Sequence, residues 1–197
     1  MTTRIALSVV AAMGLTVSAR AQTETWQLDP RHSDAQFAVR HMGISTVRGA
    51  FTKMSGTVQY NSTDRATSFI DVTIDAAAVD SRVAMRDDDL RSAKLLDVAK
   101  YPTITFKSKR VESAGEGKLK VTGTLTIHGA TKEVALDLEG PSAPIKDPQG
   151  NSRMGASATT KINRRDFGVN GYPSLMVADD VFITIDVELV KPLPANQ

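Results

Sequence analysis

Three histidines are the side chains best suited to binding a metal or moving a proton, and they lie far apart along the chain. His32, His41 and His128 do not follow the spacing of known zinc-ligand motifs. A histidine at a strand end more often serves as a hydrogen-bonding group than as a ligand. We therefore predict no metal site and no cofactor, and keep a metal held by two of these histidines as the less favoured alternative.

Three consecutive acids, Asp87 to Asp89, form the other cluster that could do chemistry. They lack the spacing of an EF-hand, whereas acids in the first turn of a helix complement the helix dipole, so we interpret them as a solvated helix start. No serine lies in a G-x-S-x-G turn, and the glycines do not cluster before a helix. We predict no catalytic residues.

Alternation of apolar and polar residues, the period of a strand with one buried face, is the pattern that must position any site. It begins at Trp26 and is clearest in residues 35–39, 47–51, 70–74, 104–106, 119–127, 134–138, 154–162 and 181–189. About eight strands at this spacing predict an all-β fold of the sandwich or barrel type. Residues 80–97 lose the period and predict one short helix, with Leu90, Ala93, Leu95 and Leu96 facing the barrel.

The inward positions of these strands include several small residues, namely Ala35, Gly49, Gly123 and Ala158. Aromatic residues make up only 5% of the chain, so large rings are scarce. An eight-stranded barrel is wide enough either to be filled by its own side chains or to hold one small ligand. We favour an incompletely filled interior and keep the filled barrel as the alternative.

The first residues have the pattern of a secretory leader. Residues 5–17 are apolar or small, follow the basic Arg4, and are too few for a helix that crosses the roughly 30 Å hydrocarbon core of a membrane. Ala19, Arg20 and Ala21 match the small-x-small pattern of a cleavage site. We predict that residues 1–21 are a cleaved signal peptide and that residues 22–197 form one barrel domain, periplasmic or secreted.

Composition restricts the partners of this domain. Removing the leader takes away two of the 24 basic residues and leaves 22 basic against 22 acidic residues. We expect that a surface without net charge has no net field that attracts nucleic acid or anionic lipid. There are no cysteines to form disulfides and no further long apolar run to cross a membrane, so we expect no integral membrane segment.

Six stretches of sequence, in a fixed order over about 140 residues, give the chain a family resemblance. They are DPRHS (Asp29–Ser33), FAVRHMGISTVRGAF (Phe37–Phe51), LRSAKLLDVAKYP (Leu90–Pro102), TITFKS (Thr103–Ser108), GTLTIHGATK (Gly123–Lys132) and NRRDFG (Asn163–Gly168). With these stretches the chain resembles the YceI-like family. The resemblance implies an extended, antiparallel, eight-stranded lipocalin-like barrel, secreted or periplasmic in bacteria, whose cavity binds a polyisoprenoid or another long-chain amphiphilic lipid, such as a quinone-type ligand.

Carried onto this sequence, the resemblance implies a set of ligand-binding residues. The apolar members are Phe37, Val39, Phe51, Leu90, Leu95, Leu96, Phe106, Leu125, Ile127 and Phe167. Leu95 and Leu96 stand where family members often carry paired aromatic residues, so the shape of the cavity differs there. His41, Arg164 and Asp166 are the polar members; they either meet a ligand head group or, as we favour, bond to backbone groups at strand ends.

We therefore predict a protein that sequesters or transports an isoprenoid lipid through the periplasm. One alternative is an extracellular interaction or stress protein with a filled barrel. The other is a hydrolase or isomerase that uses His41 with a nearby acid. We also expect that a homodimer could form through sheet edges.

Overall fold

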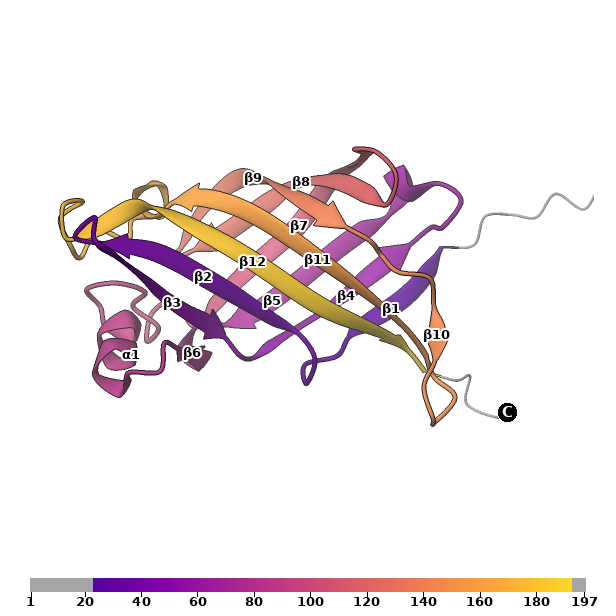
Figure 1. Cartoon of the computed structure of the whole chain (residues 1–197), viewed down its shortest axis with the longest axis horizontal. Helices are drawn as coiled ribbons and strands as arrows, with labels where there is room; N and C mark the ends of the chain where they lie inside the picture. The colour runs from indigo at the N-terminus through magenta and orange to yellow at the C-terminus, as the bar shows by residue number, and fades with distance from the viewer. Residues whose placement is uncertain (1–22, 193–197) are drawn as a thin grey trace, which may run out of the picture.

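Strands make up most of the structure, as the alternation predicts (Figure 1). The computed structural model describes residues 23–192, so the predicted leader of residues 1–21 lies outside the described residues. The long strands are β1 (Glu24–Leu28), β2 (Asp34–His41), β3 (Ser45–Phe51), β4 (Met54–Tyr60), β5 (Phe69–Asp75), β7 (Thr103–Ser113), β8 (Lys118–Ile127), β9 (Ala130–Glu139), β11 (Ser152–Asn163) and β12 (Val177–Lys191). The short elements are β6 (Val79–Asp80), β10 (Ile145–Lys146), α1 (Ala84–Arg91) and the 3₁₀ turns η1 (Arg65–Thr67), η2 (Ala76–Ala78) and η3 (Arg164–Phe167).

The strands close into a barrel because β12 pairs on both of its edges. It pairs with β11 on one side and with β1 and β2 on the other, and all of these pairs are antiparallel. β9 completes the ring by pairing with both β8 and β11. A closed ring of strands leaves few free edges, which suits a stable all-β domain.

Three of the positions around the barrel are each occupied by two short strands in place of one long strand. β1 and β2 follow one another along the same edge of β12, β3 and β4 pair with β2 and β1 respectively, and β5 and β6 pair with β4 and β3. Counting each pair of short strands as one strand gives the predicted eight strands around the barrel. The antiparallel eight-stranded barrel with one short α-helix is therefore confirmed.

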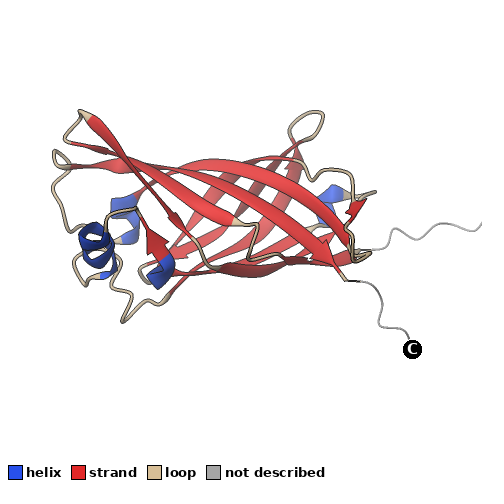
Figure 2. Ribbon diagram, turned by 60° about the horizontal axis from the view of Figure 1, so that its bottom comes forward, coloured by secondary structure: helices blue, strands red, loops and turns tan. Residues whose placement is uncertain are grey.

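The helix lies at one end of the barrel, beside β6 (Figures 1 and 2). The interpretation of its acids as a solvated helix start was wrong in part. The helix begins at Ala84, so only Asp87 falls in its first turn, and Asp87 is buried and accepts hydrogen bonds from the amide and hydroxyl of Ser81. Burial works to raise the pKa of Asp87, but these bonds outweigh it and the pKa is lowered.

Two of the four small inward residues do not leave empty space, contrary to the prediction. A Cβ at Gly49 would lie 2.5 Å from Cζ of Phe37, and one at Gly123 would lie 2.6 Å from Cζ of Phe106. Aromatic rings therefore cover both glycines. Ala35 and Ala158, in contrast, line the barrel interior directly.

Candidate functional site

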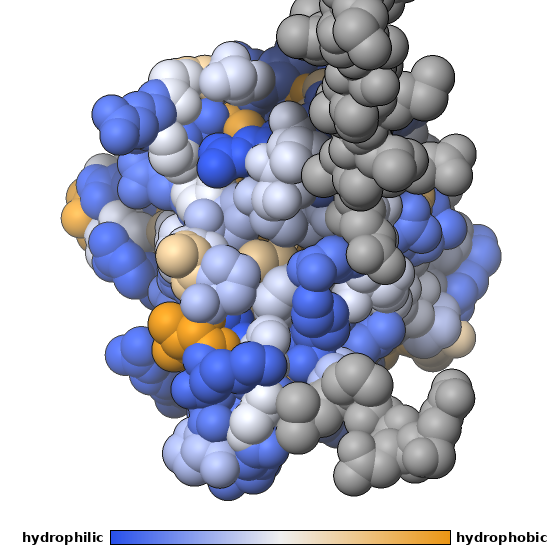
Figure 3. Space-filling model, turned by 90° about the vertical axis from the view of Figure 1, so that its right-hand side faces the viewer, coloured by the Kyte–Doolittle hydropathy of each residue, from blue (hydrophilic) through white to orange (hydrophobic). Residues whose placement is uncertain are grey.

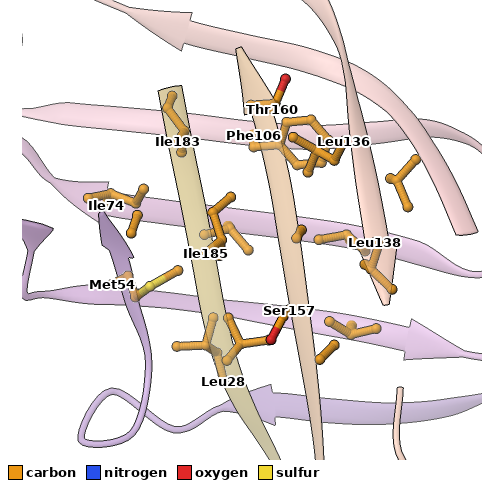
Figure 4. Close-up of a pocket in the computed structure, with 18 of the residues that line it drawn as sticks. Leu28, Met54, Ile74, Phe106, Leu136, Leu138, Ser157, Thr160, Ile183 and Ile185 are labelled. Atoms are coloured by element: carbon orange, nitrogen blue, oxygen red, sulfur yellow. The ribbon is translucent and has the colours of Figure 1, made fainter. Parts of the chain in front are cut away.

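The barrel encloses an apolar cavity with two compartments. The inner compartment has a volume of about 180 Å³, and the surface that bounds it consists of apolar atoms. In Figure 4, Ile183 and Ile185 of β12, Leu136 and Leu138 of β9, and Phe106 of β7 point into it from different strands. Strand alternation explains this lining, because every second side chain along each strand points inward.

The outer compartment is larger, with a volume of about 600 Å³, and lies at the end that carries α1. Val39 of β2 and Val181 of β12 belong to its barrel wall, and Leu90 of α1 and Leu95 beyond the helix complete its side. The strands leave a gap in the wall here, because β6 pairs with β3 and β7 pairs with β5 and β8, but β6 and β7 do not pair with each other. The helix and residues 92–102 lie at this gap.

The two compartments meet at a waist. Five residues line both compartments: Phe37, Phe51, Ile104, Ile127 and Ile183. The rings of Phe37 and Phe51 lie with their centroids 5.9 Å apart, on neighbouring strands. The position of the Phe37 ring depends on Gly49, its cross-strand partner, because any side chain there would occupy the space of the ring.

The outer compartment opens to solvent at an end that we call the mouth. Val83, Met85 and Met176 line the compartment and are 46%, 82% and 42% exposed. Polar side chains also occur in this lining, and they are His41, Arg86, Asp89, Arg164 and Tyr172. A long amphiphile would fit such a cavity with its chain inside and its polar end near this group.

Arg164 is the buried cation of the mouth, with 5% of its surface exposed. Its guanidinium donates to the backbone carbonyls of Val169, Tyr172, Val177 and Ala178 at 2.6–3.1 Å. Asp179 lies 2.9 Å away and offsets the charge, while burial lowers the pKa of Arg164. These contacts make it an organiser of the backbone between η3 and β12.

The other polar groups of the mouth include Tyr172, Asp89 and His41. The hydroxyl of Tyr172 donates to Asp89 at 2.8 Å, and the Lys94 ammonium lies 3.6 Å from the centre of the Tyr172 ring. Within residues 23–192, no acid bonds to the imidazole of His41, and no nucleophile does so either. The acid that the hydrolase or isomerase alternative requires beside His41 is therefore not in place in this geometry.

A second polar cluster lies at the far end of the barrel, opposite the mouth. Arg153 donates to Asp29 at 2.7 Å, to Asp147 at 2.9 Å and to Glu188 at 2.9 Å. This guanidinium is the main reason why the pKa of Asp29 is well below its usual range and why the pKa of Asp147 is lowered. His32 adjoins Asp29 at 3.1 Å, and together with Glu188 these two could supply three metal ligands, but Arg153 already binds both carboxylates.

Twelve of the thirteen residues predicted as ligand-binding line one or both compartments. Phe106 and Leu125 lie in the inner compartment, the waist holds Phe37, Phe51 and Ile127, and the remaining seven lie in the outer compartment: Val39, His41, Leu90, Leu95, Leu96, Arg164 and Phe167. Asp166 is different. Its side chain is exposed on η3 and does not line the cavity, because the turn directs its neighbours Arg164 and Phe167 inward instead.

Sequence reasoning missed several lining residues. Ile183 and Ile185 belong to the apolar odd-numbered positions of β12, so the alternation alone could have identified them. Met85 and Tyr172 carried no such signal, because they belong to α1 and to the loop before β12, where no strand period applies. The same holds for the Arg153 cluster, which joins residues 124 positions apart.

Comparison with known proteins places this barrel in a family. The model of the YceI-like domain matches residues 26–189, which begin within β1 and end within β12. The chain belongs to the YceI-like family. A UPF0312 protein of Vibrio cholerae is 36% identical over 167 residues, which is 85% of this chain and 88% of that protein.

Solved structures of YceI-like proteins have the same fold. The YceI protein of Campylobacter jejuni superposes with a TM-score of 0.70 at 32% identity, covering 78% of this chain and 90% of that one. A polyisoprenoid binding domain from Saccharophagus degradans, implicated in plant cell wall breakdown, superposes with a TM-score of 0.65 at 17% identity, covering 87% and 100%. Among residues 23–192, no helix is long and apolar enough to span a membrane.

Proposed function

We propose that this YceI-like protein binds a long-chain isoprenoid or a similar amphiphilic lipid and sequesters or transports it, rather than catalysing a reaction. The observation that carries this proposal is the lining of the cavity, which is apolar along the inner compartment and has its polar groups at the mouth. The Saccharophagus degradans domain that shares this fold is described as polyisoprenoid binding, which supports the same class of ligand.

The driving force is burial of the chain. Each methylene removed from water contributes about 0.8 kcal/mol, so a chain that fills both compartments has a large gross gain. Ordering the flexible chain offsets much of this gain, and specificity then comes from the cavity length and the polar groups of the mouth. Because Phe37 lies where the two compartments meet, its ring would govern how far a chain reaches into the inner compartment.

We further propose that the protein works in the periplasm or outside the cell. The apolar leader pattern supports this, and an apolar lipid needs a soluble carrier in an aqueous compartment between membranes. N-terminal sequencing of protein from fractionated cells should give Gln22 as the first residue. A chain that still begins at Met1 would contradict export with cleavage.

Mass spectrometry of lipids extracted from protein purified out of its native compartment tests the ligand. A long-chain isoprenoid in near-stoichiometric amount is expected, and its repeated absence would sink the proposal. Leu125→Asp places a carboxylate in the inner compartment and should abolish retention of the lipid and of a fluorescent apolar probe. Thr124→Asp, on the outer face of the same strand, is the control and should retain both.

A further inference from the structure

Large apolar side chains gather on the outside of the molecule around the mouth. Three segments each carry two of them, and the six are Met42 and Ile44, Val83 and Met85, and Leu175 and Met176, all between 42% and 86% exposed. The amide of Met42 donates to the carbonyl of Met176, which joins the first segment to the third. Val83, Met85 and Met176 line the outer compartment, so all three segments border one opening. We call these six residues the apolar rim.

The rest of the described surface does not repeat this pattern. Outside the rim, the exposed large apolar residues in residues 23–192 are Phe69, Ile145 and Phe182, which lie on different strands. Figure 3 shows the end opposite the mouth, where hydrophilic residues dominate the surface that is not grey. Single exposed apolar residues are common on soluble proteins, whereas a contiguous group marks a contact surface.

Arginines flank the rim. Arg40 and Arg48 enclose the turn between β2 and β3, and Arg82 and Arg86 enclose the second apolar pair before and within α1. Among the described residues, none of these four arginines forms a salt bridge; Arg40 donates instead to the carbonyl of Gly43. The three rim segments, residues 40–48, 82–86 and 170–177, contain no acid.

The acids near the rim have partners on the protein. Asp87 accepts from Ser81, Asp88 pairs with Arg91, and Asp89 accepts from Tyr172. Asp80 accepts from the backbone amide of residue 82. Within the described residues, Arg40, Arg48 and Arg82 are therefore left as cations that no acid pairs with, whereas Arg86 donates to Ser81 and lies near Asp87. This local positive charge is compatible with the zero net charge counted for the predicted mature domain. Apolar side chains that project beside unpaired cations form the pattern of a surface that binds the interface of an anionic bilayer.

We propose that the apolar rim docks on a bilayer that contains anionic lipids, with the mouth facing the membrane. The apolar side chains would enter the boundary between head groups and acyl chains, and the arginines would contact the phosphates. A protein partner would explain the apolar contacts equally well, but the opening of the cavity within the rim favours a bilayer. The proposal rests on the proposed function, because such docking lets a lipid enter the cavity without crossing water.

Vesicle flotation tests this docking with two kinds of vesicle: pure phosphatidylcholine, and phosphatidylcholine with 30% phosphatidylglycerol, roughly the anionic content of bacterial membranes. Wild-type protein should float with the anionic vesicles at low salt and be released by 0.5 M NaCl, roughly where the Debye length falls below 5 Å. Each arginine near an anionic surface contributes about fivefold in affinity, so Arg48→Gln with Arg82→Gln should weaken binding about 25-fold. Replacing Ile44 and Leu175 together by serine should weaken it at least about tenfold.

The matched control is Ile145→Ser with Phe182→Ser, which removes two exposed apolar side chains outside the rim, 66% and 55% exposed, and should float like the wild type. None of the substituted residues lines the cavity, so retention of a fluorescent apolar probe in vesicle-free solution should be unchanged in every variant. Wild-type protein that fails to float, or rim variants that float as well as the control, would overturn the docking proposal. Flotation without any probe or lipid retention would instead contradict the proposed function and leave the docking surface standing.

Discussion

Replacing Arg164 by methionine tests whether this buried cation organises the mouth or serves the ligand. The guanidinium makes four bonds to backbone carbonyls at 2.6–3.1 Å with 5% of the residue exposed. Bonds to a charged donor contribute roughly 1.5–3 kcal/mol each, and the desolvation of the cation offsets a large part of their sum. Because Asp179 keeps its contact with Arg165 at 2.7 Å, no acid is left without a cation. The four carbonyls that lose their donor cost roughly 1–3 kcal/mol each where they stay buried, and removal of the desolvated cation offsets part of this, so we expect Arg164→Met to lower the free energy of unfolding by about 3–5 kcal/mol.

Urea unfolding followed by Trp26 fluorescence measures this change. The chain contains a single tryptophan, and Trp26 packs with Leu28 and Met154 at the far end, so its signal reports the whole barrel rather than the loop before β12. Arg165→Met is the matched control, because Arg165 bonds to the same acid from an exposed position and should cost less than about 1 kcal/mol. Equal costs for the two variants, together with loss of lipid from Arg164→Met alone, would refute the organising role.

Three further predictions concern the far end, the waist and the inner compartment. The lowered pKa of Asp29 stabilises the fold above about pH 4 and this stabilisation is lost as the pH falls further, so Arg153→Met should both destabilise the protein at pH 7 and flatten the decline in urea midpoint between about pH 5 and pH 2. Gly49→Ala should cost about 1–3 kcal/mol in urea unfolding, because the new methyl group overlaps the ring of Phe37. Ala158→Phe should fill part of the inner compartment and shift the bound lipids, measured by mass spectrometry, toward shorter chains.

Controls for these variants come from neighbouring positions. Gly155→Ala should change stability little, because the nearest atom to the added methyl group is the carbonyl oxygen of Val187 at 3.6 Å. Thr159→Phe places the same ring as Ala158→Phe on the exposed face of β11 and should leave the lipid profile unchanged. An unaltered pH dependence in Arg153→Met, a stable Gly49→Ala, or unchanged chain lengths in Ala158→Phe would each contradict the reasoning behind that variant.

The strands and most of the cavity wall could be predicted because a period of two residues encodes both. Ile127 and Val181 needed no knowledge of the partner strand to be placed inside. The interruptions between paired strands could not be predicted, since the turn at Ala76 to Ala78 forms where the backbone leaves one partner strand for the next.

The failures have a common cause in contacts between distant residues. From the sequence alone, Gly49 predicts empty space in the barrel interior. The structure shows that the ring of its cross-strand partner Phe37 fills this space. For Arg164 the sequence favoured a bond to backbone groups at a strand end over a ligand contact, but it could not identify the carbonyls, from Val169 to Ala178, that the guanidinium reaches. Asp166 lies two residues after Arg164, but in the tight turn of η3 its side chain is exposed while that of Arg164 is buried.

The double pairing of β12 has a consequence for how the protein folds. This strand forms twelve residue pairs with β11 and also pairs with β1 and β2, so the first and last strands of the barrel must find each other across the whole sequence. Pairings of such high contact order form slowly. The ring therefore cannot close until Val177 to Lys191 have been synthesised, and an incomplete chain keeps its apolar faces open. Late closure of the barrel is compatible with the export proposed above, because a barrel that has not yet closed leaves the chain free to cross a membrane before it folds.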